Sequence, residues 1–449
     1  MAKSPGTMNQ ILSIMTVALN ELTIGIAHGW IAPTLNSLQS PRGEFNVTIE
    51  ESSWLASLDD LGKIPGAVFA AVVLDIVGRK ILLTSCSLVF FVIWVVIIFT
   101  RSVPVICSMR LLIGFFFGIN DGTNSTYLAE NSSPAIRGPF GALCITFYYI
   151  GVLVGSATAT YFSYTTTSVI NAAITLSALI SVLWIKEPVQ FLLMKGKITK
   201  AEKNFNWLHG NNTDSEFERI KQNVQSENLK KLSFKKTITS PANYKSLSII
   251  VTINGLVGCV GYYPIMCYAS IAFSATDMFT SNQLTVLFGV IQTLVVASTS
   301  LFIGHFNRRS LILISFSLIA FSHVVTSGLY YVNSYMVQIP YFPWLIFTSI
   351  TFFASLYAFV YPAIFLIRGE MFPLSIKATG GCFSVIAYSA TSFLGVKVFL
   401  NISQSYGIEV NFLIFFVFSL ITIIFTYFFL PETKNKTLIE IQEMLERSK

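Results

Sequence analysis

The chain has 449 residues, of which 53% are hydrophobic and 11% are charged, and its mean hydropathy is +0.66. A soluble domain with an apolar core and a charged shell cannot be built from this composition, so we predict an integral membrane protein. The net charge of +7 comes from basic residues that lie mainly in loops between apolar runs, so it indicates membrane topology and excludes a nucleic-acid interface.

Runs of about 20 apolar residues, long enough to cross ~30 Å of hydrocarbon as a helix, occur twelve times along the chain. We therefore predict an all-α membrane protein with twelve transmembrane helices. The expected spans are 9–32, 53–76, 81–100, 105–129, 139–161, 166–185, 246–271, 284–304, 310–331, 343–367, 378–400 and 409–430.

A polar segment at 186–245 separates the sixth span from the seventh and has helix-like spacing of apolar residues in places. The predicted domains are an N-terminal six-helix bundle at 1–185, this linker with short helices, a C-terminal six-helix bundle at 246–430 and a tail at 431–449. Six spans, a loop and six more spans are typical of transporters whose two halves move about a central site.

The distribution of basic residues predicts that both termini are cytoplasmic. With the N-terminus inside, all but five of the 29 Lys and Arg residues lie on the cytoplasmic side, as the positive-inside rule requires. In this topology Asn46, in the sequon Asn46-Val-Thr48, lies on the first outer loop and is a candidate for glycosylation. The sequence shows no pattern of an enzyme active site, a cofactor site or a metal site.

Five ionisable residues are expected inside the membrane. Such residues are costly there, usually pair with one another and often mark a transport pathway. The depth of each along its span places Glu21 and Lys63 near the same level, so we predict an ion pair between them, assisted by Asp59 or Asp60. The fifth residue, Asp121, lies within the fourth span.

Six short motifs occur in the order found in the sugar porter family of the major facilitator superfamily. They are Asp75-Ile-Val-Gly-Arg79-Lys80, Arg110-Leu-Leu-Ile-Gly114, Tyr127-Leu-Ala-Glu130 followed by Arg137-Gly138, Glu187-Pro188 with Phe191-Leu-Leu193, Gly369-Glu370-Met-Phe-Pro373 and Pro431-Glu432-Thr433-Lys434. The chain resembles this family from about residue 20 to 440, and within it the insect trehalose-transporter-like group.

The resemblance implies a charged cluster in each half, at the cytoplasmic ends of the helices. These clusters would hold the two halves together when the transporter opens outward. The N-terminal cluster would consist of Asp75, Arg79, Glu130 and Arg137. The C-terminal cluster would consist of Arg308, Arg309, Glu370, Glu432 and Lys377, with Lys377 where an arginine is usual and Gly304 where an acid is usual.

The resemblance fails at the hexose site, where the family uses mostly amide side chains. The matching positions here are Ile145, Val257, Gly258, Tyr263, Gln292 and Phe365. Only Gln292 keeps an amide, which can donate to and accept from sugar hydroxyls. Aromatic rings can stack on sugars, and phenols can bond their hydroxyls. The candidate substrate-binding residues are therefore Gln292, Tyr263, Tyr268, Tyr357, Phe365 and Tyr388.

The resemblance implies facilitated transport of a sugar, either trehalose or a hexose, across the plasma membrane by alternating access. Proton-coupled members carry an aspartate two residues after a glycine in the first span, and this chain has Ala27 after Gly25, which favours uniport. Two alternatives stay open: a transporter of another small organic solute, such as a cation attracted by Asp59, Asp60 and Asp121, and a sugar sensor without transport. The expected partners are the solute and the lipid bilayer, and the oligomeric state is left open.

Overall fold

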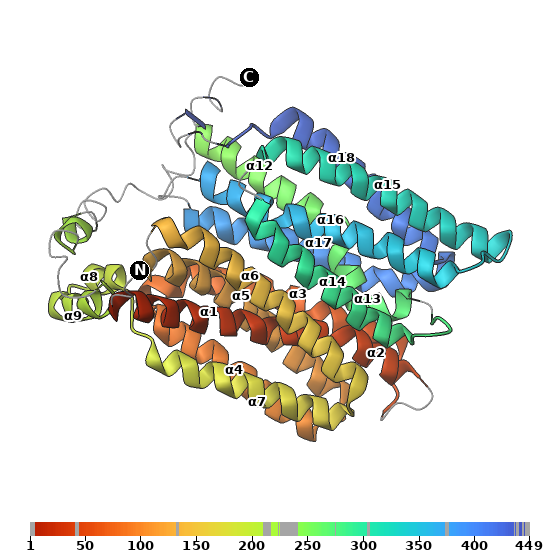
Figure 1. Ribbon diagram of the computed structural model, residues 1–449, viewed down its shortest axis with the longest axis horizontal. Helices are drawn as coiled ribbons and strands as arrows, with labels where there is room; N and C mark the ends of the chain where they lie inside the picture. Colours follow the sequence, from red (N-terminus) through yellow and green to blue (C-terminus); the bar gives the residue numbers. More distant parts are fainter. Residues whose placement is uncertain are drawn as a thin grey trace.

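The fold is shown by a computed structural model in which every regular element of the described residues is a helix (Figure 1). The described residues are 5–40, 45–131, 134–209, 217–222, 224, 241–273, 275–302, 306–372, 377–434, 436, 440–441 and 444. In Figure 1 the N-terminal bundle, coloured red to yellow, lies beside the C-terminal bundle, coloured green to blue.

Nine helices of the N-terminal bundle and the linker have described bounds. They are α1 (Pro5–Gly29), α2 (Ile31–Gln39), α3 (Ile49–Val77), α4 (Arg79–Phe99), α5 (Val103–Asn131), α6 (Pro134–Tyr161), α7 (Tyr164–Trp184), α8 (Val189–Met194) and α9 (Ile198–His209). The C-terminal bundle consists of α12 (Pro241–Gly258), α13 (Tyr262–Ala272), α14 (Ser281–Phe302), α15 (Arg308–Tyr335), α16 (Phe342–Met371), α17 (Lys377–Tyr406) and α18 (Ile408–Phe429).

Eleven spans in the described part of the chain are long and apolar enough to cross a membrane, with α1–α2 and α12–α13 each counted as one. The remaining expected span, 53–76, corresponds to α3, which has 29 residues but carries charged residues in its middle. It packs between α5 of its own bundle and α17 of the other bundle, and these neighbours cover its charges. The predicted all-helical membrane fold is confirmed.

The two most extensive helix contacts, α3 with α5 and α1 with α6, depend on glycines spaced four residues apart. A Cβ atom on Gly62 or Gly66 of α3 would meet the backbone of α5, and one on Gly114 or Gly118 would meet the backbone of α3. Small residues at this spacing let membrane helices approach closely without a hydrophobic driving force. The equivalent glycines between α1 and α6 are Gly25, Gly29, Gly151 and Gly155.

The first helix of each bundle is interrupted partway along its length. Trp30, between α1 and α2, keeps helical backbone angles, whereas between α12 and α13 the chain turns at Cys259–Gly261. Gly261 has φ +92°, in the left-handed region that favours glycine, and a Cβ atom there would overlap the ring of Phe415. The second helices of the two interrupted spans, α2 and α13, contact each other across the two bundles.

The helices α8 and α9 define one end of the molecule, which we call the linker end; the opposite end is the far end. At the linker end, Asn9 of α1 donates to the Trp207 carbonyl of α9 at 2.7 Å. Asn204 of α9 donates to the Glu187 carbonyl at 2.8 Å, and this bond ties α9 to the segment that follows α7. The linker helices therefore belong structurally to the N-terminal bundle.

Polar contacts between the bundles lie in the far half of the molecule or near its middle. At the far end, Asn36 of α2 donates to Asn282 of α14 at 2.8 Å. The ammonium of Lys397 on α17 lies 2.6 Å from the Glu50 carboxylate of α3. In this conformation the far end is closed.

Candidate functional site

Four buried side chains form a cluster in the middle of the N-terminal bundle, which we call the central cluster: His28 of α1 and Asp59, Asp60 and Lys63 of α3. The Lys63 ammonium lies 3.1 Å from Asp59 and 2.8 Å from Asp60. His28 Nε2 lies 2.7 Å from the same Asp59 oxygen, and its Nδ1 lies 2.6 Å from the Tyr148 hydroxyl of α6. The cluster therefore links three helices of one bundle.

The helical spacing of α3 explains why this cluster forms. Residues three and four apart lie on the same face of a helix, so Asp59 and Asp60 both reach Lys63. The ammonium also lies 4.4 Å from the ring centre of Phe117 and 4.7 Å from that of Tyr263. Rings in these positions attract a cation where water is excluded.

Arg110 of α5 balances the second carboxylate of the central cluster. It is fully buried, and it donates to the carbonyls of Leu55 on α3 and Ala27 on α1, both at 3.0 Å. With a neutral His28, two carboxylates and two cations give no net charge. Buried charges are tolerated in a bilayer only when they are paired in this way.

The predicted ion pair between Glu21 and Lys63 is wrong. Lys63 is already engaged by the two aspartates on its own helix. Glu21 instead accepts a hydrogen bond from the Asn124 amide of α5 at 2.6 Å. The two side chains share a similar depth, but depth alone does not determine which helix faces meet.

The central cluster is also the main polar contact between the two bundles. Tyr263 of α13 donates to Asp59 at 2.8 Å, and Ser392 of α17 donates to Asp60 at 2.5 Å. Both donors belong to the C-terminal bundle and both carboxylates to the N-terminal bundle. Separation of the bundles at the far end would break both bonds. Neither His28 nor Ser392 was predicted from the sequence, because a single serine or histidine in a span gives no signal of its own.

Three of the predicted substrate-binding residues are committed to contacts within the protein. Tyr268 is fully buried, stacks on Phe399 and donates to the Val396 carbonyl at 3.2 Å, so the structure gives it a packing role. Gln292 is 2% exposed. In the orientation that satisfies both ends of its amide, its nitrogen donates to the Ala354 carbonyl at 3.1 Å, and its oxygen accepts from Ser355. Tyr263 is bound to Asp59, as described above.

The other three predicted residues lie on α16 and α17. Tyr357 is buried between the stacked rings of Tyr262 and Tyr361, with ring centres 4.1 and 5.6 Å away, and donates to the Tyr388 hydroxyl at 3.3 Å. Tyr388 is partly exposed, and Phe365 is 40% exposed. Phe365 and Tyr388, together with the partly exposed Tyr361, are therefore the aromatic residues of this group that a solute can reach.

The residues expected in the N-terminal cluster are brought together at the linker end. The Arg79 guanidinium lies 2.7 Å from Glu130 of α5 and 3.0 Å from Asp75 of α3. Arg137 lies in α6, but its side chain is outside the described residues. Glu187 also belongs to this cluster, a role that was not predicted: it accepts from the Arg79 and Lys80 backbone N–H groups at 2.5 and 3.3 Å.

The C-terminal cluster repeats this arrangement. Arg308 lies 3.5 Å from Glu370 of α16, compared with 2.7 Å for the equivalent pair in the N-terminal bundle. Glu432 accepts from the backbone N–H groups of Arg308 and Arg309 at 3.0 and 3.1 Å. The Thr433 hydroxyl donates to the second oxygen of Glu370 at 2.5 Å. The side chain of Lys377, and all of Gly304, lie outside the described residues.

Glu187 and Glu432 therefore have the same role in the two bundles. Each carboxylate caps the N-terminus of the third span of its bundle, α4 or α15. Helix N-termini carry free N–H groups and a partial positive charge that favour a carboxylate. Burial raises the pKa of the Glu187 carboxyl, and the two backbone donors and the Arg79 charge oppose this shift. The dipeptides Glu187-Pro188 and Pro431-Glu432, one after each bundle, were the signal in the sequence.

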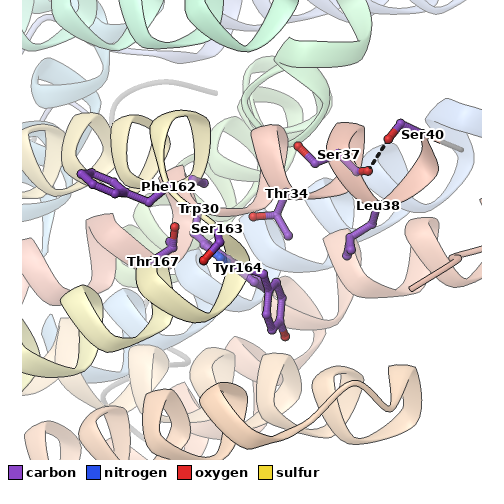
Figure 2. Close-up of a pocket in the computed structure, with 10 residues that line it drawn as sticks. Trp30, Thr34, Ser37, Leu38, Ser40, Phe162, Ser163, Tyr164 and Thr167 are labelled. Carbon is purple, nitrogen blue, oxygen red and sulfur yellow. Dashed lines mark hydrogen bonds between the residues drawn. The ribbon is translucent and has the colours of Figure 1, made fainter. Parts of the chain in front are cut away.

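A separate cavity of about 330 Å³ lies at the far end of the N-terminal bundle, between α2, α6 and α7 (Figure 2). Its lining combines aromatic and hydroxyl-bearing side chains, including Trp30, Thr34, Tyr164 and Thr167. All of its lining residues belong to one bundle, and none belongs to the charged clusters or to the predicted substrate site. It is therefore not placed on a path between the bundles. Asn46, the predicted glycosylation site, is exposed in the loop before α3.

Comparisons with known proteins agree with this architecture. The structure is similar to the inward-open conformation of the xylose transporter XylE from E. coli, with a TM-score of 0.79, 17% identity, and coverage of 96% of this chain and 98% of that one. It is also similar to the proton:xylose symporter XylE bound to 6-bromo-6-deoxy-D-glucose, with a TM-score of 0.77, 18% identity, and coverage of 98% and 100%. Both likenesses support the fold of the major facilitator superfamily.

Curated relatives match the sequence over almost its whole length. The facilitated trehalose transporter Tret1 of Polypedilum vanderplanki is 25% identical over 442 residues, which cover 97% of this chain and 88% of the relative. The protein of the same name from Apis mellifera ligustica is 24% identical over 445 residues, which cover 96% and 87%. The family described as "Sugar (and other) transporter" matches residues 15–445. The predicted resemblance is confirmed, and the chain belongs to this sugar transporter family.

Proposed function

We propose that this protein carries a neutral sugar, trehalose or a hexose, across the plasma membrane by facilitated diffusion. The observation that carries this proposal is the family match over residues 15–445, together with relatives named as facilitated trehalose transporters. The linker end would face the cytoplasm, because most of the basic residues of the loops lie there.

Alternating access would follow from movement of one bundle against the other. Close glycine contacts hold α3 to α5 and α1 to α6 inside the N-terminal bundle, whereas the two bundles meet where α3 packs against α17 and α6 against α14, with hydrogen bonds and an ion pair toward the far end. Opening of the far end would break the bonds from Tyr263 to Asp59 and from Ser392 to Asp60. Each hydrogen bond contributes about 1 kcal/mol net, so thermal motion and ligand binding can shift the balance.

The two clusters at the linker end would stabilise the state in which that end is closed. We expect Arg79→Met, which removes the cation shared by Asp75 and Glu130, to increase the share of molecules open at the linker end. The measurement is the rate of maleimide labelling of a cysteine introduced by Phe365→Cys, in a protein whose six native cysteines are replaced by serine. Lys203→Met on the exposed face of α9 is the control. Unchanged labelling in Arg79→Met would contradict this role.

Uptake of radiolabelled trehalose and glucose into proteoliposomes tests the proposed function. We expect saturable uptake that persists when a protonophore removes the pH gradient, because Ala27 stands where proton-coupled members have an aspartate. Uptake that collapses with the gradient would overturn uniport. Tetraethylammonium uptake without sugar uptake would favour a cation transporter, and sugar binding without flux would favour a sensor.

A further inference from the structure

The cavity between α2, α6 and α7 lies apart from the charged clusters and from the predicted substrate site (Figure 2). Its volume of about 330 Å³ is at the lower end of the ~300–1,000 Å³ that is usual for small-molecule sites. Of its ten described lining residues, none is charged and six carry a hydroxyl group: Thr34, Ser37, Ser40, Ser163, Tyr164 and Thr167. This lining suits a neutral ligand about the size of a monosaccharide.

Two polar groups in the cavity wall have no hydrogen-bond partner among the described residues. Trp30 is 2% exposed, and its indole N–H donates to no acceptor there. The hydroxyl of Thr34, a residue that is 6% exposed, makes no hydrogen bond with another described residue either. In Figure 2 this hydroxyl points from α2 toward Ser163 and Thr167. A buried donor without an acceptor is costly, and a ligand that supplies the acceptor removes that cost.

Two aromatic side chains in the lining are held in place by neighbours outside the cavity. The ring of Trp30 packs edge-on against Trp94, with ring centres 5.6 Å apart. The ring of Tyr164 lies under the Arg101 guanidinium, 4.6 Å from the ring centre, and this guanidinium also donates to the Thr165 hydroxyl at 2.6 Å. Rings that are already ordered can pack on the apolar face of a hydroxylated ligand at little entropic cost.

The helices that line the cavity also bind α14 of the other bundle, where the far end closes. Ser37 lines the cavity and accepts from the Asn282 amide at 3.3 Å, and the adjacent Asn36 donates to the same side chain at 2.8 Å. On α6, Thr160 follows the lining residue Ala159 and donates to the Asn282 carbonyl at 3.4 Å. A ligand that joins α2 to α6 and α7 therefore holds the surface on which α14 closes.

We propose that this cavity is a second binding site, for a neutral polyhydroxylated molecule of monosaccharide size, and that a ligand there keeps the far end closed. An oxygen of the ligand accepts from the Trp30 N–H, and a hydroxyl of the ligand pairs with that of Thr34. Because the cavity is lined by one bundle, its ligand regulates the movement of the bundles and is not itself carried between them. The inference goes beyond the proposed function and does not depend on which solute is transported.

Protection of a cysteine in the lining tests the site directly. The full-length protein, with its six native cysteines replaced by serine, carries Ser40→Cys. We expect glucose to slow maleimide labelling of this cysteine in a saturable way, and tetraethylammonium and glucose 6-phosphate to have no such effect at the same concentration. Ser102→Cys, at an exposed serine between α4 and α5, is the matched control, whose labelling should not depend on glucose.

Two further substitutions separate this site from the path between the bundles. Thr34→Val removes the hydroxyl with little change of shape, and Trp30→Phe removes the indole N–H. Each is expected to raise the glucose concentration that halves the labelling rate roughly fivefold, as the loss of one hydrogen bond predicts. Thr175→Val removes a buried hydroxyl of α7 outside the cavity and should leave that concentration unchanged. The thermal stability of each variant is compared with that of its parent.

The effect on the far end is measured with a separate pair of cysteines in the same background, Asn36→Cys and Asn282→Cys, which a short bifunctional maleimide can join when that end is closed. We expect glucose to increase the rate of cross-linking. At the same glucose concentration, the increase should be smaller when Thr34→Val is added and unchanged when Thr175→Val is added. A cross-linking rate that does not respond to glucose would overturn the regulatory role.

Three results would overturn the site itself. The first is labelling of Ser40→Cys that glucose does not slow. The second is protection that Thr34→Val and Trp30→Phe both leave unchanged, since it would then come from glucose bound elsewhere. The third is equal protection by tetraethylammonium or glucose 6-phosphate, which would exclude selection of a neutral ligand. These measurements need no transport, whereas failure of the proposed function is seen as absence of sugar uptake by the wild type.

Discussion

Replacement of Lys63 by methionine is expected to destabilise the protein by about 3 to 5 kcal/mol, because it leaves two buried carboxylates without their shared cation. Asp59 and Asp60 would keep only hydrogen bonds from neutral groups and the more distant charge of Arg110. Thermal unfolding in detergent, followed by size-exclusion chromatography, and sugar uptake would both report the loss.

The stability of Glu21→Gln should be compared with that of Lys63→Met. A glutamine at this position still offers an oxygen to the Asn124 amide, so we expect a change in unfolding free energy of less than about 1 kcal/mol. An ion pair between Glu21 and Lys63 would instead make both variants severe. Lys63→Arg keeps the charge and should recover part of the stability. A Lys63→Met protein as stable as the wild type would show that the central cluster is arranged differently.

Replacement of Gly114 by leucine is expected to abolish folded, transport-competent protein. The Cβ atom alone would overlap the backbone of Asp59, so α5 would have to move away from α3. Overpacking costs ~1–3 kcal/mol where side chains can adjust, and a larger loss is expected where helix backbones are in contact. The shift would also move the Asp59 carboxylate relative to His28 and Tyr263, so a small surviving fraction should not transport.

Gly122→Ala is the matched control for Gly114→Leu. Gly122 lies on the same helix two turns away, and the nearest atom to an added Cβ would be the Ala70 side chain at an ordinary 3.6 Å. We expect this variant to be produced and to carry sugar like the wild type. Equal loss in both variants would indicate a general intolerance of α5 to substitution, and normal yield of Gly114→Leu would contradict the close packing.

The class and fold could be predicted from the sequence because hydrocarbon thickness imposes a simple length rule on apolar runs. The span 53–76 was also predicted from the sequence. Its structural counterpart, α3, is not among the eleven helices apolar enough to cross a membrane, because it carries charged residues. The pairing of Arg79 with Glu130 was accessible through motifs, which preserve contacts between distant parts of the chain. The main partner of Lys63 was not, because depth along a span does not show which helix faces meet, and Asp59 and Asp60 were given only an assisting role.

For the candidate substrate-binding residues, the sequence did not predict which side chains are exposed to a solute and which are buried by neighbouring helices. A helix inside a membrane bundle is apolar on every side, so its sequence does not show which face meets water. Tyr268 and Tyr388 are the same residue type on spans that both border the interior, yet the first is fully buried against Phe399 and the second is partly exposed.

The caps formed by Glu187 and Glu432 have a consequence for the order in which each bundle is completed during synthesis. Each bundle is completed only by residues that follow its sixth span, since the carboxylate on the α4 or α15 terminus comes from that segment. A nascent N-terminal bundle cannot acquire its cap until residue 187 has left the ribosome. A self-sufficient half of this protein must therefore include the segment that follows its last membrane helix.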